Sequence, residues 1–304
     1  MRLALKVDVD TLRGTRRGVP ALLAALGEAG AGATFLFSLG PDHTGRVIRR
    51  VFRPGFLGKQ MRTSALATYG FKTLLYGTLL PGPDISRRAG AVMRQVRDAG
   101  FEVGIHCFDH VTWQDFVTRR GPEWTARQID LAVARFEAVF AERPRVHGAA
   151  GWQMNEAALR HEERLGFAYA SDTRGQFPFV PLIAGRRGSC PQLPTTLPTL
   201  DELIGVDGAT PENVHEVLLR LTRAPPPHGH VFTLHAELEG MALLPVLRRL
   251  LAGWRAQGYE LVSMASIYAA LDVAKLPGCE VVAGTVPGRS GELACQQPPV
   301  LSGS

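Results

Sequence analysis

The first apolar run of the chain ends in the stretch Val7-Asp8-Val9-Asp10-Thr11, which begins a strand–helix pattern that continues along the sequence. Side chains alternate between the two faces of a β-strand, so Asp8 and Asp10 point the same way. Two carboxylates at the end of a buried strand repel each other unless a cation or a catalytic role compensates them. The stretch alone therefore allows two interpretations, a solvated strand end or part of a polar site.

Composition limits the class of protein. The chain has 304 residues, of which 45% are hydrophobic and 20% charged, and this favours one large domain with a substantial core. No window holds 18 uninterrupted apolar residues, and the N-terminus reaches Asp8 too soon for a signal peptide. The four cysteines show no CxxC spacing, which favours reduced thiols in a cytosolic protein. A net charge of +6 permits an anionic partner without naming one.

Short apolar runs alternate with amphipathic segments along most of the chain. Such alternation predicts parallel strands joined by crossover helices, in a closed or nearly closed α/β arrangement. Further strands are expected at residues 33–37, 101–105, near 146, 167–171, 231–234 and 259–262, and helices at 19–29, 86–99, 123–142, 155–165, from 210, and 242–254. The basic residues 13–18 are expected to form a loop. We expect a single domain over residues 1–275 and an extended or partly ordered tail over 276–304.

Residues 43–83 differ from the rest of the chain in charge. They contain no Asp or Glu but seven Lys or Arg, interleaved with aromatic and aliphatic residues. This composition is typical of a segment that faces an anionic membrane surface. The alternative is an excursion that packs its apolar side on the domain and leaves its arginines solvated. No recognition motif accompanies the charge, so no nucleic-acid partner is expected, and no protein partner can be inferred.

Three apolar strands end in polar residues. The first ends in Asp8 and Asp10, another in His106 and a third in His235. In a parallel barrel these strand ends share one rim, the rim where active sites are assembled. If the strand turns into a helix at His106, then His106 and His110 lie on one face and can hold one metal ion. With a carboxylate from the first strand, this gives a two-His, one-carboxylate set that suits Zn, Co, Mn or Fe alike.

The motifs around these residues resemble those of a known family. Asp8-Val9-Asp10, His106-xxx-His110 and Leu234-His235 are similar to the first, second and last motifs of the polysaccharide deacetylase (NodB-homology) family. The resemblance is closest to a branch that removes the formyl group from an amino sugar carried on undecaprenyl phosphate. It extends over nearly the whole chain, through residues 7–16, 37–42, 149–152, 171–175, 196–199 and 233–237.

The resemblance implies a distorted (β/α) barrel with an insertion at residues 43–83. It also implies that Asp10, His106 and His110 bind one divalent metal ion, that Asp8 is the general base and that His235 is the general acid. In this chemistry the metal ion activates water, Asp8 takes its proton as it attacks the formamide carbon, and His235 protonates the departing amine. Formate and a free 4-amino sugar result.

The chain departs from the family in its third motif. Many members carry an Arg there that orients the base, whereas this chain has Ala149-Ala150-Gly151-Trp152. Arg174 is a candidate to replace that Arg. Arg13 and Arg16 could hold the lipid phosphate or be solvated. Trp152 could line the sugar pocket or be core. The other residues expected to contact substrate are Asp172, Arg174, Thr196 and Glu237.

The expected function is therefore that of a metal-dependent deformylase. Its predicted substrate is an undecaprenyl-phosphate-linked 4-deoxy-4-formamido-L-arabinose, met at the cytoplasmic face of the bacterial inner membrane. The resemblance implies a role in lipid A modification and polymyxin resistance. One alternative is a deacetylase of another N-acyl amino sugar. A second alternative, of another class, is a barrel that binds anionic lipid without catalysis.

Overall fold

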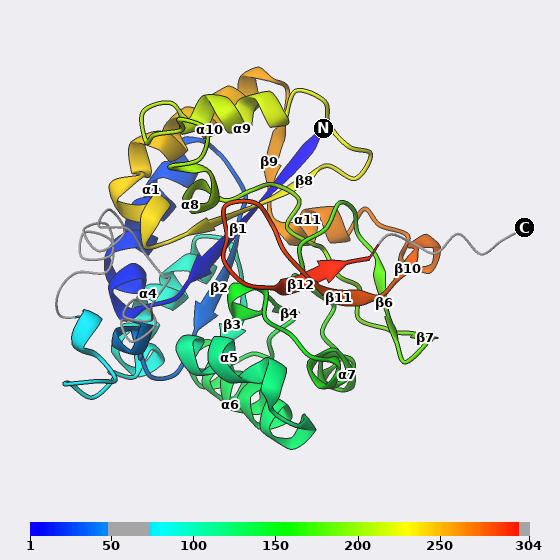
Figure 1. Ribbon diagram of the computed structural model, residues 1–304. Coiled ribbons are helices and arrows are strands. Elements are labelled where there is room, and N and C mark those ends of the chain that lie inside the picture. The colour runs from blue at the N-terminus through cyan, green and yellow to red at the C-terminus, as the bar shows by residue number, and fades with distance from the viewer. Residues whose placement is uncertain (48–72, 298–304) are drawn as a thin grey trace, which may run out of the picture.

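A curled sheet of seven parallel strands forms the centre of the molecule in the computed structural model, which describes residues 1–47 and 73–297 (Figure 1). The strand order is β5-β4-β3-β2-β1-β8, and β9 also pairs with β1. These strands are β1 (Arg2–Val9), β2 (Thr34–Ser38), β3 (Glu102–Cys107), β4 (Val146–His147), β5 (Tyr169–Ala170), β8 (His230–His235) and β9 (Glu260–Val262). The predicted parallel α/β architecture is therefore present.

Helices surround this sheet. They are α1 (Val19–Glu28), α4 (Ile85–Asp98), α5 (His110–Phe116), α6 (Pro122–Phe140), α7 (Glu156–Leu165), α8 (Leu200–Leu203), α9 (Val214–Leu221), α10 (Leu244–Ala256) and α11 (Met264–Tyr268). Short helical turns are η1 (Gly14–Gly18), η2 (Thr44–Val47), η3 (Thr73–Leu75), η4 (Val117–Arg119), η5 (Ala150–Trp152), η6 (Leu238–Ala242) and η7 (Val273–Lys275). Several helices begin at a side-chain cap, as where Asp84 accepts from the backbone N–H of Arg87 at 3.0 Å.

The two faces of β1 have different surroundings because its side chains alternate. Leu3, Leu5 and Val7 are fully buried against the helices. Burying side chains of this size contributes about 1.5–3 kcal/mol each to folding. The opposite face carries Ala4, Lys6 and Asp8 toward the concave interior of the sheet. The interior is thus apolar at Ala4 and becomes polar toward the carboxyl end of the strand.

The basic residues 13–18 do not form the loop that we predicted. They belong to a helical segment, with η1 leading directly into α1. A Cβ on Gly14 would collide with the Glu237 carboxylate, and one on Gly18 with the carbonyl oxygen of Ala236. The two glycines therefore allow a helix to approach the residues after β8 closely, and they do not mark a turn.

The residues after 275 pack onto the domain through two small sheets. In the first, β10 (Gly278–Cys279) pairs with β6 (Val180–Ile183), which also pairs with β7 (Arg186–Arg187). The second is an antiparallel hairpin of β11 (Val281–Gly284) and β12 (Leu293–Gln296), drawn in orange and red in Figure 1. We predicted an extended or partly ordered tail here because its residues lack periodicity.

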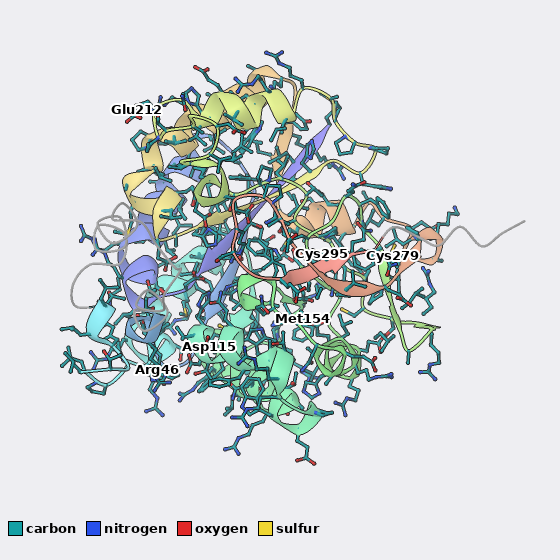
Figure 2. All side chains as sticks on the ribbon, viewed as in Figure 1. Arg46, Asp115, Met154, Glu212, Cys279 and Cys295 are labelled. Atoms are coloured by element: carbon teal, nitrogen blue, oxygen red, sulfur yellow. The ribbon has the colours of Figure 1, made fainter. Side chains whose placement is uncertain are left out.

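The insertion at residues 43–83 is described only at its two ends, since residues 48–72 lie outside the described part of the chain. Arg46 donates from Nε to the carbonyl oxygen of Gly77 at 3.1 Å and thereby joins the two ends. Figure 2 shows Arg46 at the periphery of the molecule, well apart from Cys279 and Cys295. Within residues 1–47 and 73–297, no helix is long and apolar enough to cross a membrane.

Candidate metal centre and catalytic pocket

A pocket of about 200 Å³ opens at the carboxyl ends of β1, β3 and β8. Asp8 on β1 is in register with His235 on β8, so the two side chains stand on neighbouring strands at the same level. Asp10 follows the last residue of β1, and all three residues line the pocket. The parallel register therefore brings together two sites that lie more than two hundred residues apart in the sequence.

Asp10, His106 and His110 form a compact donor set. Asp10 Oδ1 lies 3.3 Å from His106 Nε2 and 3.4 Å from His110 Nε2. His106 Nδ1 lies 2.7 Å from the carbonyl oxygen of Gly148, which can only accept, so Nδ1 carries the proton and Nε2 offers a lone pair. One carboxylate oxygen and two imidazole nitrogens within 4.8 Å of one another fit a divalent ion such as Zn, Co, Mn or Fe.

The two histidines come from different elements. The β2–β3 register jumps from Phe37↔Ile105 to Ser38↔Cys107, so His106 occupies a β-bulge without a partner residue. His110 is the first residue of α5, and the side chain of Asp109 caps that helix by accepting from Thr112 N at 3.1 Å. The two histidines, four residues apart in the sequence, thus lie on either side of a strand–helix junction. Their imidazole centroids are 5.4 Å apart.

The charge on Asp10 follows from these neighbours. Burial of the Asp10 carboxyl favours its neutral form, but His110 and His106 outweigh burial and hold the pKa of Asp10 well below its ordinary value. Asp10 is therefore an anion at neutral pH. The described residues leave Asp10 Oδ1 and Asp8 Oδ1 without a hydrogen-bond donor, although both atoms are buried. Buried carboxylate oxygens of this kind are open to a cation or to a proton.

Lys6 is a buried lysine beside the pocket residue Asp8, and it was not among the predicted site residues. Its Nζ lies 3.8 Å from Asp8 Oδ2 and donates to the carbonyl oxygen of Ser171 at 2.8 Å. Burial lowers the pKa of Lys6 below its ordinary value, even though Asp8 and Asp172 act in the opposite direction. The alternation that puts Asp8 and Asp10 on one face of β1 puts Lys6 there too, so this residue could have been found from the sequence.

Arg174 does not take the position beside Asp8. Its NH1 donates to Glu202 Oε1 at 2.6 Å, and its NH2 donates to the carbonyl oxygen of Leu197 at 3.0 Å. In this chain the cation next to Asp8 Oδ2 is Lys6. We predicted that Arg174 takes the place of the arginine missing from the third motif, but the structure puts Lys6, a residue of β1 itself, beside Asp8.

Removing the Lys6 charge is expected to destabilise the protein. Lys6→Met leaves the carboxylates of Asp8 and Asp172 buried without this cation, which typically costs about 3–5 kcal/mol. The free energy of unfolding, measured by urea denaturation, should fall by that amount. The control is Lys275→Met, because the Lys275 side chain is 84% exposed and its loss should change the free energy by less than about 0.5 kcal/mol. Equal stability of the two variants would contradict a charged Lys6.

His235 is surrounded by carboxylates that the sequence analysis did not identify. Glu239 Oε2 accepts from the backbone N–H of His235 at 2.7 Å, and Asp201 lines the same pocket. Burial acts to lower the pKa of His235, but Asp201, Asp10 and Glu239 outweigh it and raise the pKa to about 9. His235 therefore carries a proton at neutral pH, as a general acid requires.

Glu237 lines the pocket, and its contacts anchor the end of β1. Its Oε1 accepts from Asp10 N at 3.2 Å, Thr11 N at 2.9 Å and Thr11 Oγ1 at 2.7 Å. Burial and the charge of Asp10 raise the pKa of Glu237 to about 8, so the side chain is largely neutral at pH 7. Glu237 thereby fixes the backbone of the residue that supplies the carboxylate of the donor set.

The other predicted substrate contacts lie away from this pocket. Trp152 is 1% exposed, with its Nε1 donating to Thr195 Oγ1 at 3.1 Å, and Asp172 is fully buried. Thr196 and Arg174 line a separate cavity, while the exposed Arg16 donates to the carbonyl oxygen of Arg88. Arg13 is partly buried and is not among the pocket residues either. Of the expected substrate-contacting residues, the structure brings Glu237 alone into the lining.

A second group of potential ligands is sealed in the interior. His147 Nδ1 lies 2.6 Å from Glu162 Oε1 and 3.0 Å from Asp172 Oδ1. Burial lowers the pKa of His147, but the two carboxyls outweigh it and raise the pKa to about 10. His147 is thus a protonated donor between two carboxyl groups. A protonated imidazole offers no lone pair to a metal ion, so the cluster is better described as a buried ion-pair network than as a metal site.

Comparison with known proteins places the chain among amide hydrolases of sugars. No family model matches it. Two curated relatives are each named as a probable 4-deoxy-4-formamido-L-arabinose-phosphoundecaprenol deformylase. The relative from Shewanella sediminis is 36% identical over 296 residues, covering 97% of this chain and 94% of the relative. The relative from Wigglesworthia glossinidia brevipalpis is 30% identical over 288 residues, covering 93% and 98% respectively.

The fold is also found among solved structures. A Mycobacterium smegmatis protein named as a polysaccharide deacetylase matches with a TM-score of 0.63 and 17% sequence identity. The match covers 93% of this chain and 95% of that protein. Likeness at this level of identity concerns the fold alone, and it confirms the predicted distorted (β/α) barrel of the deacetylase type.

Proposed function

The chain belongs to the family of 4-deoxy-4-formamido-L-arabinose-phosphoundecaprenol deformylases, and from this premise we propose that it hydrolyses the formamide of a lipid-linked 4-formamido sugar. The products are formate and the free 4-amino sugar, still attached to undecaprenyl phosphate. One observation carries the proposal most directly. Asp8 and His235, a carboxylate and a protonated imidazole, stand in register on neighbouring strands beside the Asp10 donor set.

Asp10, His106 and His110 are the residues that would hold the divalent ion. When bound there, such an ion supplies Lewis acidity toward water and toward the amide carbonyl. The chemistry of the donors does not select among Zn, Co, Mn and Fe. His106 keeps its orientation through the hydrogen bond from Nδ1 to the Gly148 carbonyl oxygen, a contact that fixes the tautomer needed for binding.

Asp8 and His235, two further residues of the pocket lining, divide the proton transfers. Asp8 accepts the proton of the water molecule that attacks the formamide carbon, because its Oδ1 is buried without a donor while Lys6 stands next to Oδ2. His235 then donates its proton to the sugar nitrogen as the carbon–nitrogen bond breaks. An amine leaves poorly as an anion, so this protonation is needed for the bond to break at neutral pH.

We place the reaction at a membrane surface because a polyprenyl phosphate has to be met at a bilayer. The acid-free, basic composition of residues 43–83 suits anionic lipid, and the net charge of +6 suits it too. The proposed location is the cytoplasmic face of the bacterial inner membrane, where the protein would act peripherally. Its proposed role there is in lipid A modification and polymyxin resistance.

Product analysis tests the proposal. Purified protein, depleted of metal and reloaded with one of Zn, Co, Mn or Fe at a time, is given the formamido sugar on a polyprenyl phosphate. We expect formate and the 4-amino sugar in equal amounts by mass spectrometry, and no product from the metal-depleted protein. The acetamido counterpart of the same sugar is the control substrate, and it should release much less acetate.

Two other outcomes would replace this function. Faster release of acetate than of formate would identify a deacetylase of N-acetylated sugars. Binding to anionic vesicles without any product, under every metal tested, would identify a lipid-binding barrel without catalysis.

A further inference from the structure

The loop between β11 and β12, residues 285–292, carries one arginine into the catalytic pocket. Arg289 lines that pocket together with Asp8, Asp10 and His235. Among the described residues of the lining, it is the only lysine or arginine. Figure 1 shows this loop, in red, extending from the hairpin toward α8. The C-terminal hairpin therefore contributes a permanent positive charge to a pocket formed mainly by the central sheet.

The position of Arg289 is built into the fold. Gly288 adopts a φ of +78°, and a Cβ there would collide with the carbonyl oxygen of Glu202 on α8. The backbone N–H of Arg289 donates to the carbonyl oxygen of Val286 at 3.3 Å, and Gln153 Nε2 donates to that of Glu292 at 2.7 Å. Close contact at Gly288 and a hydrogen bond at the end of the loop thus hold the arginine over the pocket.

The guanidinium of Arg289 lies over a buried aromatic platform. It is 4.7 Å from the centroid of the Trp152 ring, and Arg174 lies 4.9 Å from the same ring. Trp152, which we expected either to contact the sugar or to be core, is buried as the core alternative predicted, and its ring supports a residue that faces the pocket. Stacking on an aromatic ring stabilises a guanidinium while leaving its N–H groups free to donate at the edges.

Glu202 does not neutralise Arg289. Glu202 Oε1 is 2.6 Å from Arg174 NH1 but 3.5 Å from Arg289 NH1, and Glu202 Oε2 accepts from Thr199 N at 3.1 Å. One carboxylate is thus shared by two guanidinium groups, and the longer contact is the one to Arg289. Asp201 is a second carboxylate in the same pocket lining. The Arg289 side chain is 22% exposed, so the charge is accessible to a ligand.

We propose that Arg289 receives the phosphate of the lipid-linked sugar and thereby determines substrate specificity; this rests on the proposed function. An anionic substrate approaching Asp8, Asp10 and Asp201 would otherwise meet like charge. A guanidinium matches the geometry of phosphate oxygens. In a 4-formamido pyranose the formamide and the anomeric phosphate lie at opposite ends of the ring. The pocket lining holds both the donor set, which would face the formamide, and Arg289, which would face the phosphate.

A pair of substrates tests this role. One is the formamido sugar on a short polyprenyl phosphate, and the other is the methyl glycoside of the same sugar, which lacks the phosphate. Arg289→Gln should lower kcat/KM for the phosphate substrate by about 10- to 100-fold more than for the methyl glycoside, mainly through KM. Arg289→Lys keeps the positive charge but loses the paired N–H donors of the guanidinium. Its kcat/KM for the phosphate substrate should lie between those of the wild type and of Arg289→Gln. Arg186→Gln, at an exposed position of β7, is the matched control.

Direct binding separates this proposal from the proposed function. The affinity of the phosphate substrate for the metal-depleted protein is measured by titration calorimetry for the wild type and for Arg289→Gln. We expect weaker binding to the variant by about 10- to 100-fold. Equal binding to both proteins, or an equal loss of kcat on both substrates, would overturn the role of Arg289 even if formate is produced. Weaker binding of the variant without formate from the wild type would overturn the proposed function and keep the phosphate contact.

Discussion

Replacing Asp8 by Asn should abolish turnover while the protein keeps its divalent metal. Asn has nearly the shape of Asp but cannot accept the proton of the attacking water. Asp8 is absent from the donor set of Asp10, His106 and His110, so metal affinity should change little. The loss of a positioned base typically lowers kcat by about 100- to 10,000-fold. Formate release at saturating substrate measures kcat, and elemental analysis of the dialysed protein measures the metal.

The control for Asp8→Asn is the same substitution at Asp98, whose side chain is 61% exposed. Asp98→Asn should retain both activity and metal. If Asp8→Asn kept more than a tenth of the wild-type kcat, Asp8 would not be the base. If it lost activity together with the metal, Asp8 would have to be counted among the ligands.

Replacing His110 by Ala should remove the metal ion. The substitution takes away one of three converging donors and leaves Asp10 Oδ1 and His106 Nε2, which lie 3.3 Å apart. Changes to residues that only support a ligand already cost 10- to 100-fold in affinity, so the loss of a ligand should exceed about 100-fold. The measured quantities are metal per chain after dialysis and the metal dissociation constant by competition with a chelator.

His228→Ala is the control for this experiment, because His228 is exposed and lies in a loop before β8. It should bind the metal as the wild type does. Unchanged metal content in His110→Ala would refute the donor set. In that event the next group to test is His147, Glu162 and Asp172, which also places three ligand atoms within 4.8 Å.

The sequence predicted the parts of the site that depend on short-range patterns. The alternation of side chains along β1 places Asp8 and Asp10 on one face, and the strand–helix order places their strand end on the same rim as that of His235. The sheet has both features. Family motifs carried the remaining assignments of roles, and these roles stay predictions until the variants are measured.

The parts that were missed depend on contacts between distant residues. Arg289 lies in a region without periodicity, and its position depends on the packing of Gly288 against Glu202, which no local pattern predicts. The helical turn at Gly14 was predicted as a loop because glycine usually marks a turn. Glycine at position 14 instead leaves room for the carboxylate of Glu237, more than two hundred residues away.

The pairing of β1 has a consequence for how the protein is made in the cell. The ribosome synthesises β1 first, but two of the strands that pair with β1 come much later in the chain. These are β8 and β9, within residues 230–262. At roughly 5–20 residues per second, about 10 to 45 seconds pass before β8 exists. During that interval the edge of β1 needs protection from aggregation, and Asp8 has no His235 beside it. His235, the proposed acid, is therefore added late in translation, and we expect chains released before that point to be inactive.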